Sequence, residues 1–479
     1  MLASFARPEP TVFFSRFTAF GLCLAGLLFA LTRLSDAWAL PVLAIFSCLC
    51  LLGVIDLIQA RHAVRRNYPI IGRLRWAFEK IRPEIRQYLI EGDDDQTPFS
   101  RAQRSLVYAR AKDEVSDRPF GTLSDVYKNG YEFISHSTKP RPLADPDSFR
   151  VPIGGSDARD PYMASIFNIS AMSFGSLSAN AIRALNKGAK LGDFAHDTGE
   201  GGISPYHREN GGDLIWEIGS GYFGCRTEKG RFDPVRFADN AADPQVKMIE
   251  LKLSQGAKPG HGGILPGEKV SPEIAATRGI PVGVDCISPA EHSAFSTPLE
   301  MMQFLAQLRT LSKGKPVGFK LCVGHPWEFM GMVKAMRETG IIPDFIVVDG
   351  AEGGTGAAPV EFADNLGMPM RESLLFVHNT LVGAGVRDRI KIGAAGKIVS
   401  AFDIAAVLGL EMTAAAGLSH PSELGPHHLV RCVSLTEIRL FSQLHIFLED
   451  GELLSGTHER DFYSAAWKLA RADRFELAA

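Results

Sequence analysis

The stretch Phe345-Ile-Val-Val-Asp-Gly-Ala-Glu-Gly-Gly-Thr-Gly-Ala, residues 345–357, joins a short apolar run directly to a glycine-rich loop. The apolar run has the length of a strand, and the glycines allow the backbone that follows to approach a ligand closely. The same order recurs in short runs along the chain, at residues 167–170, 194–197, 214–218, 248–253, 317–321, 345–349 and 390–393. Helical stretches separate many of these runs, among them residues 179–190, 299–311, 327–338 and 401–408.

Strands that alternate with helices predict a parallel sheet, and hence an α/β fold. Polar or glycine-rich residues follow nearly every run. That distribution favours a TIM-type (β/α)8 barrel, whose sites gather at the carboxyl ends of all its strands. A doubly wound sheet would concentrate them at one switch point. We therefore expect a barrel over residues 151–410.

Two apolar stretches, residues 17–34 and 37–57, precede the barrel. Each approaches the ~20 residues that a spanning helix needs. Only two residues link them, so the sequence predicts a transmembrane hairpin within residues 1–66. Arginines flank its outer ends, and the positive-inside rule then places both ends in the cytoplasm. The barrel would face the cytoplasm from the inner membrane. A cleaved signal peptide and a buried helical hairpin are the alternatives.

The remaining parts of the chain suggest no chemistry of their own. Residues 67–150 are expected to form a connecting and packing segment, in which the stretch from Trp76 predicts an amphipathic helix suited to a membrane surface. Residues 411–479 would be a C-terminal extension. The net charge of −3 gives no reason to expect a nucleic-acid partner. The seven cysteines show no C-x-x-C spacing, which indicates a reducing compartment, and we expect no metal ion.

Polar side chains follow the first, second and fourth runs at positions suited to a ligand. Ser173 could contact a flat ring, although an ordinary turn explains it at least as well. Glu200, flanked by glycines, could accept a hydrogen bond from an amine or imine, or be an exposed acid. Gln255 offers a donor and an acceptor, and Lys258 a point charge for a small carboxylate. A plain surface loop is the alternative for these two.

Lys320 stands in an otherwise apolar run, where an unpaired charge would be costly to bury. Its partner would be either the carbonyl edge of a flavin or acidic side chains in a structural ion pair. The loops after the sixth and seventh runs can turn N–H groups toward a phosphate, which barrels often bind near strands seven and eight. The candidate phosphate contacts are Gly353, Gly354, Thr355, Gly393, Ala395, Gly396 and Lys397.

Four motifs give these residues a family context. They are Met172-Ser-Phe-Gly, Thr198-Gly-Glu-Gly-Gly, Ser254-Gln-Gly-Ala-Lys-Pro-Gly-His-Gly-Gly and Glu352-Gly-Gly-Thr-Gly-Ala. In this order they resemble the FMN-binding synthase domain of glutamate synthase. The chain is most similar to the stand-alone, membrane-associated members of that family, strongly over residues 67–410 and weakly beyond them.

The resemblance implies that FMN is held by Ser173, Gln255, Lys320 and the two glycine-rich loops. It also implies a 2-oxoglutarate pocket formed by Glu200, Gln255 and Lys258, with Glu200 and Lys258 as catalytic residues. In the family's chemistry, ammonia and 2-oxoglutarate condense to an imine, and reduced FMN passes a hydride to it to give L-glutamate. The sequence does not identify the electron donor.

Two departures from the family pattern lead to further expectations. The chain starts Met-Leu-Ala-Ser, with no N-terminal cysteine nucleophile, so ammonia would come free or as glutamine-derived ammonia from a partner. The family's C-x5-C-x4-C motif is missing, because residues 401–410 run directly into residues 411–421. We therefore predict that the 3Fe-4S cluster is absent. The barrel would be incomplete at strand eight, for which residues 410–415 are the remaining candidate.

These departures keep two alternatives to glutamate synthesis open. The chain would be a membrane-anchored pseudoenzyme if it has lost its electron input. It would be an FMN-dependent oxidoreductase of a different specificity if it acts on another amine, such as N-methylglutamate.

Overall fold

The structure is a computed structural model that describes residues 16–90, 92, 98–114, 117, 119–141, 149–155, 158, 160–259, 262–356, 358–407, 425–456 and 461–477. The chain divides into two compact units, Met1–Asp117 and Arg118–Ala479. The candidate for strand eight, residues 410–415, lies outside the described residues.

The first unit begins with two apolar helices, α1 (Thr18–Leu31) and α2 (Ala39–Ile58), which pack against each other. A Cβ atom at Gly53 would lie 2.3 Å from the ring of Phe20, so the close approach of the helices requires glycine there. By length and composition, α2 is the one described helix able to cross a membrane. α1 is apolar but has 14 residues, about 21 Å, which is shorter than the predicted first span.

Shorter helices follow in the same unit: α3 (Ala63–Asn67), α4 (Gly72–Ile85), the π-helix η1 (Arg86–Ile90) and α5 (Arg101–Ala111). The carboxylate of Asp56, buried near the end of α2, accepts hydrogen bonds from Arg73 and from the N–H of Ile70. These bonds fix the start of α4 to the end of α2. α4 has the amphipathic character predicted from Trp76, and its exposed apolar side chains include Leu74 and Phe78.

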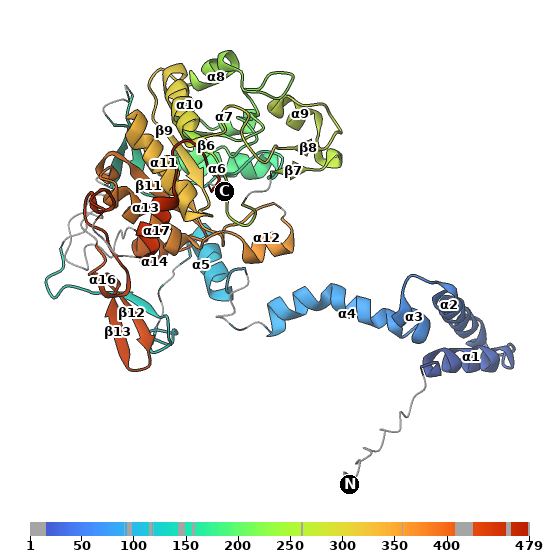
Figure 1. Ribbon diagram of the computed structural model, residues 1–479. Coiled ribbons are helices and arrows are strands. Elements are labelled where there is room, and N and C mark those ends of the chain that lie inside the picture. Colours follow the sequence, from blue (N-terminus) through green and yellow to red (C-terminus); the bar gives the residue numbers. More distant parts are fainter. Residues whose placement is uncertain are drawn as a thin grey trace, which may run out of the picture. The chain divides into compact units, whose positions relative to one another are not determined.

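The second unit contains a six-stranded parallel sheet in the order β11-β10-β9-β6-β5-β4 (Figure 1). The strands are β4 (His196–Asp197), β5 (Leu214–Ile218), β6 (Val246–Lys252), β9 (Val317–Leu321), β10 (Phe345–Asp349) and β11 (Lys391–Ala395). The predicted run at 167–170 forms no strand, and only Ile169 makes an isolated parallel bridge, to His196. Within the described chain, no strand pairs with the second edge of β11. The six parallel strands and the helices that connect them form part of an α/β barrel.

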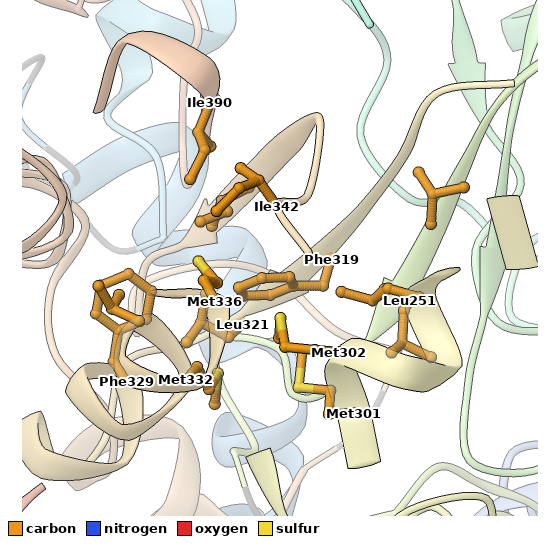
Figure 2. Close-up of a cluster of buried hydrophobic side chains, with 14 of the residues drawn as sticks. Leu251, Met301, Met302, Phe319, Leu321, Phe329, Met332, Met336, Ile342 and Ile390 are labelled. Carbon is orange, nitrogen blue, oxygen red and sulfur yellow. The ribbon is translucent and has the colours of Figure 1, made fainter. Parts of the chain in front are cut away.

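Helices connect and cover these strands: α6 (Ala179–Gly192), α7 (Pro205–Arg208), α8 (Pro234–Ala241), α10 (Pro298–Leu311), α11 (Pro326–Thr339), α12 (Val360–Asn365), α13 (Met370–Gly383) and α14 (Ala401–Val407). The main core lies between the sheet and these helices. Figure 2 shows Phe319 of β9 among Leu251, Met302 and Met336. Burial of the apolar side chains on β9 and β10 fixes which residues face the barrel interior.

An excursion between β6 and α10 was not predicted from the sequence. It contains β7 (Ile264–Leu265), the 3-10 helix η3 (Gly267–Lys269), α9 (Pro272–Arg278) and β8 (Cys286–Ile287). β7 and β8 pair antiparallel, and Ile274 and Leu265 belong to a second, smaller core. β2 (Arg150–Ile153) and β3 (Tyr162–Ser165) also pair antiparallel.

Segments from before and after the barrel meet in a three-stranded antiparallel sheet of β1 (Glu132–Ile134), β12 (Leu429–Ser434) and β13 (Glu437–Leu440). β12 and β13 project from the body of the unit in Figure 1. Glu132 accepts hydrogen bonds from Arg431 and Arg371. The short helix α16 (Phe441–Leu444), the 3-10 helices η4 (Arg387–Arg389) and η6 (Glu452–Leu454), and α17 (Asp461–Leu469) complete the unit.

Candidate active site

Most of the candidate residues lie at or beyond the carboxyl ends of the parallel strands, where a barrel site is expected, whereas Lys320 and Gly393 lie inside β9 and β11. Ser173 follows the Ile169 bridge and Glu200 follows β4. Gln255 and Lys258 follow β6, and residues 353–355 follow β10. Because neighbouring parallel strands end at the same edge of the sheet, these loops meet.

The loops after β6 and β10 are joined by three hydrogen bonds. The side-chain amide of Gln255 donates to the hydroxyl of Thr355 at 3.3 Å. The N–H of Gly256 donates to the carboxylate of Asp349 at 2.9 Å, and a backbone bond links Ala257 to Ala351. A Cβ atom at position 256 would lie 1.9 Å from a backbone oxygen, so only glycine permits this contact. The glycines of both motifs thus bring Gln255 and Thr355 together.

Glu200 lies at the centre of a polar network at the barrel mouth. The ammonium of Lys252 is 3.1 Å from its carboxylate and 2.5 Å from the side-chain oxygen of Gln255. Burial raises the pKa of Glu200, but Lys252, with Arg278 and Lys258, outweighs burial and lowers the pKa below its ordinary value. Glu200 is therefore a carboxylate at neutral pH.

The side chain of Lys258 is buried, and it lies close to the same network. Burial lowers the pKa of its ammonium, Glu200 raises it and Lys252 lowers it again, with a net shift downward. Lys252 and Lys258 therefore place two cationic side chains beside one carboxylate. That charge pattern is suited to a small dicarboxylate.

Lys252 was missed by the sequence analysis, although the signal was present. In β6 two of the three charged residues, Glu250 and Lys252, stand two positions apart, next to the apolar residues Ile249 and Leu251. Alternate strand residues share a face, so both side chains point into the barrel. Glu217 in β5 shows the same signal, since it interrupts the run Leu214–Ile218.

Lys320 lies deeper in the barrel than the other candidates. Its ammonium forms ion pairs with Glu217 and, at 3.4 Å, with Glu250, and all three side chains are at most 4% exposed. Carboxylate oxygens of Asp197, Glu217 and Glu250 lie within 4.8 Å of one another. Lys320 supplies the positive charge at the centre of these acids. Its predicted contact with a flavin remains a prediction, and the geometry is that of the alternative, a structural ion pair.

The deep acids have altered protonation. Burial, with the charge of Glu217, raises the pKa of Asp197 to about 7. Burial also raises the pKa of Glu250 and of Asp349, and the nearby Asp197 adds to the effect at Glu250. One lysine cannot neutralise this group of acids, so a proton is retained among them near neutral pH.

The remaining candidates surround the mouth of the barrel. The hydroxyl of Ser173 donates a hydrogen bond to the hydroxyl of Ser176 at 3.0 Å, and a Cβ at Gly199 would lie 2.7 Å from the backbone nitrogen of Ser173. The loops of Ser173 and Glu200 are therefore in close contact. A Cβ at Gly354 would meet nothing within 4 Å, so its backbone is open to a ligand.

The loop after β11 is the other part of the predicted phosphate site. Gly393 and Ala395 belong to β11, and the N–H of Gly350 donates to the carbonyl of Ala395 at 2.8 Å. Gly396 and Lys397 both have positive φ, at 145° and 48°. This loop thus lies beside the loop after β10, but no described hydrogen bond joins it to Gln255.

Comparison with known proteins now adds to this geometry. Residues 125–418 match the family model described as the conserved region in glutamate synthase. The chain belongs to the glutamate synthase family. The matched region holds every candidate site residue, and the resemblance inferred from the four motifs is confirmed.

Three relatives indicate the extent of the similarity. The glutamate synthase large subunit-like protein YerD of Bacillus subtilis is 38% identical over 74% of this chain and 74% of its own length. The archaeal-type glutamate synthase (NADPH) of Thermotoga neapolitana is 36% identical over 50% of this chain and 44% of its own length. The archaeal glutamate synthase (NADPH) of Methanocaldococcus jannaschii is 36% identical, with the same shares. The chain spans less than half of these last two relatives.

Proposed function

We propose that the chain is an FMN-dependent oxidoreductase that aminates 2-oxoglutarate reductively to L-glutamate. Membership of the family supports an enzyme of this kind. The observation that carries the proposal is the mouth network, in which Glu200, Lys252 and Gln255 are linked and Lys258 lies nearby.

In this proposal the two lysines hold the carboxylates of 2-oxoglutarate. Glu200, as a carboxylate, accepts a hydrogen bond from ammonia or from the imine nitrogen and orients it. The side chain of Gln255, itself held by Thr355, fixes the loop that covers the substrate. Enclosure by the strand-end loops limits the access of water to the imine.

The described residues fit FMN at the mouth. Open backbone at Gly354 and the positive-φ turn at Gly396 and Lys397 suit a phosphate, and Ser173 lies against the loop of Glu200. FMN, when bound, would supply the hydride. Gln255, Gly353, Thr355, Gly393 and Ala395 complete the proposed contacts, with Lys320 below them.

Visible absorption of the purified full-length protein tests the cofactor part. A flavin spectrum is expected, without a 3Fe-4S contribution. The activity test measures glutamate formed by dithionite-reduced protein from 2-oxoglutarate and ammonia. We expect Lys258→Met to reduce this rate at least roughly 10²-fold, whereas Lys269→Met, an exposed lysine of the same excursion, should not change it.

The outcomes separate the alternatives. Bound flavin without glutamate formation would favour the pseudoenzyme, which the missing cluster cysteines and the unpaired edge of β11 in the described residues also support. Activity with another amine in place of glutamate chemistry would favour an enzyme of N-methylglutamate type. Stoichiometric iron and sulfide would overturn the prediction that the cluster is absent.

We further propose that the first unit attaches the protein to the cytoplasmic membrane through α2 and the apolar α1. α2 is 20 residues long, and the basic and apolar side chains of α4 suit an anionic membrane surface. Deleting residues 1–66 should release a soluble protein, measured by fractionation without detergent. If the shortened protein still requires detergent, α4 is the stronger attachment.

A further inference from the structure

The imidazole of His207, in α7, is fully buried and lies between two loops of the candidate site. One loop follows β4 and carries Glu200, and the other carries Ser173. The N–H of Met172, next to Ser173, donates to the carbonyl of Asp197 at 3.2 Å. That bond joins the two loops where they begin, and the ring of His207 joins them a second time.

One ring nitrogen of His207 contacts the end of the Glu200 loop. The backbone N–H of Ser204, which caps α7, donates to Nδ1 at 3.1 Å, and the Ser204 hydroxyl lies 2.8 Å from the same nitrogen. The hydroxyl in turn accepts a hydrogen bond from the backbone N–H of His207. This is a capping box with histidine at the position where glutamate or glutamine is usual. Because a backbone N–H can only donate, Nδ1 carries no proton.

The other ring nitrogen contacts the Ser173 loop. Since Nδ1 is unprotonated, the ring proton is on Nε2, which donates to the carbonyl of Met172 at 3.3 Å. Burial lowers the pKa of His207 to about 4, so the ring is neutral near pH 7 and keeps this arrangement. The N–H and the carbonyl of Met172 are therefore both held, one by Asp197 and one by His207.

His196 provides a comparison within the same part of the core. Its ring centroid is 5.2 Å from that of His207, and it is equally buried. Within the described chain, neither of its ring nitrogens has a hydrogen-bond partner. Burial lowers its pKa to about 3, so this ring is also neutral. The two neighbouring histidines thus share burial and charge, but it is His207 that bridges the loops.

We propose that His207 is a positioning residue, whose neutral ring fixes the Ser173 loop against the Glu200 loop at the mouth of the barrel. The bridge is a property of the folded chain. Its consequence for the reaction rests on the proposed function, in which Ser173 contacts FMN and Glu200 orients the imine. Without the bond to Met172, the Ser173 loop would lose one of the hydrogen bonds that hold it, and FMN would bind more weakly.

Two substitutions separate the two ring contacts. His207→Asn places an amide oxygen near the position of Nδ1, so it can still accept from Ser204, but its side chain is too short to reach the Met172 carbonyl. His207→Gln extends to about the position of Nε2 and can donate to that carbonyl, and glutamine is usual in a capping box. His196→Phe is the matched control, because it replaces the neighbouring ring without removing a described hydrogen bond.

Hydrogen exchange of the full-length protein in detergent, without added FMN, measures the bridge directly. In His207→Asn the amides of residues 173–177 should exchange roughly tenfold faster than in the wild type, the factor expected for loss of one hydrogen bond. His207→Gln and His196→Phe should exchange at the wild-type rate. FMN affinity, measured by quenching of flavin fluorescence, should follow the same order, with roughly tenfold weaker binding in His207→Asn.

Unchanged exchange in His207→Asn would refute the bridge. Equal acceleration in His207→Asn and His207→Gln would also refute it, since the ring would then only fill space. Thermal melting shows whether each variant is folded. If His207→Asn is not, His207→Gln decides: wild-type exchange at residues 173–177 supports the bridge, and faster exchange refutes it. If the wild type itself binds no FMN, the proposed function fails, whereas the exchange rates still test the bridge.

Discussion

The barrel interior contains charged side chains in a deep layer and in a mouth layer. The two layers differ in how far their charged groups are exposed. In the deep layer Lys320 pairs with Glu217 and Glu250, and these side chains are at most 4% exposed. In the mouth layer Lys252 contacts Glu200 and Gln255, with side chains of the two charged residues 10% and 17% exposed. The deep charges are enclosed and face one another, whereas the mouth charges border the loops of the candidate site. Similar residue types are thus enclosed in the deep layer and partly exposed in the mouth layer, where we propose that they bind the substrate.

The largest effect is expected from Lys320→Met. It leaves buried carboxylates without their cation, and removal of one partner from a buried pair costs roughly 3–5 kcal/mol. Urea unfolding of the full-length protein in detergent measures this loss. A loss below about 1 kcal/mol would show that the deep layer does not stabilise the fold. If Lys320 also contacts flavin, the variant should bind FMN more weakly, and the bound flavin should have a lower reduction potential. An unchanged affinity and an unchanged potential would mean that Lys320 has a structural role alone.

Lys252→Met should affect activity more than stability. We expect the rate of glutamate formation to fall roughly 10²-fold or more, because the mouth loses a charge that would hold the substrate. Lys247→Met is the matched control, since Lys247 lies in the same strand but is paired at the surface with Asp213. If both variants retain full activity, the mouth layer is not the substrate site.

The deep layer should also make stability depend on pH. Burial raises the pKa of Asp197 to about 7, above the value of about 3.9 in an unfolded chain. Between these values the folded protein binds a proton that the unfolded chain releases, so the free energy of unfolding falls as pH rises toward 7. From pH 5 to pH 7 we expect a fall of about 2 kcal/mol relative to Asp197→Asn. Parallel curves for the two proteins would contradict this assignment.

The smallest effect is expected from Gln255→Leu. It removes the bond to Thr355 and the contact with Lys252, at a cost of about 1 kcal/mol in unfolding free energy. Thermal melting should detect this change, and FMN retention in the same samples would show whether the loop still holds the cofactor. A gain in stability would mean that the polar contact is not favourable in the folded protein.

The sequence predicted the central strands best. The runs at 214–218, 317–321 and 345–349 coincide with β5, β9 and β10. Each run is mainly apolar over five consecutive residues, which leaves little choice of where the strand begins and ends. The run at 167–170, Phe-Asn-Ile-Ser, is shorter and half polar, and only Ile169 forms a bridge. Pairing depends on neighbours that a single run does not reveal. The first apolar stretch also gave a shorter helix, because turn residues follow Leu31.

The site was predicted in part for a related reason. Motif residues such as Gln255 and Thr355 stand in glycine-rich loops, and a hydrogen bond joins these two side chains in the structure. Lys252 and Arg278 stand outside those motifs, one in a strand and one at the end of a short helix. Their roles depend on which distant side chains the fold brings near them, and that information is tertiary.

The pairing of β1 with β12 also affects the order in which the protein can assemble. Glu132 and Arg431 are separated by 299 residues. At synthesis rates of about 5–20 residues per second, β1 would wait roughly 15–60 s on the ribosome before its partner emerges. The intervening barrel strands can meet their neighbours earlier, since their connections are shorter. The β1 edge is therefore the last to be covered in the nascent chain, and during that interval it is open to pairing with another chain or to a chaperone.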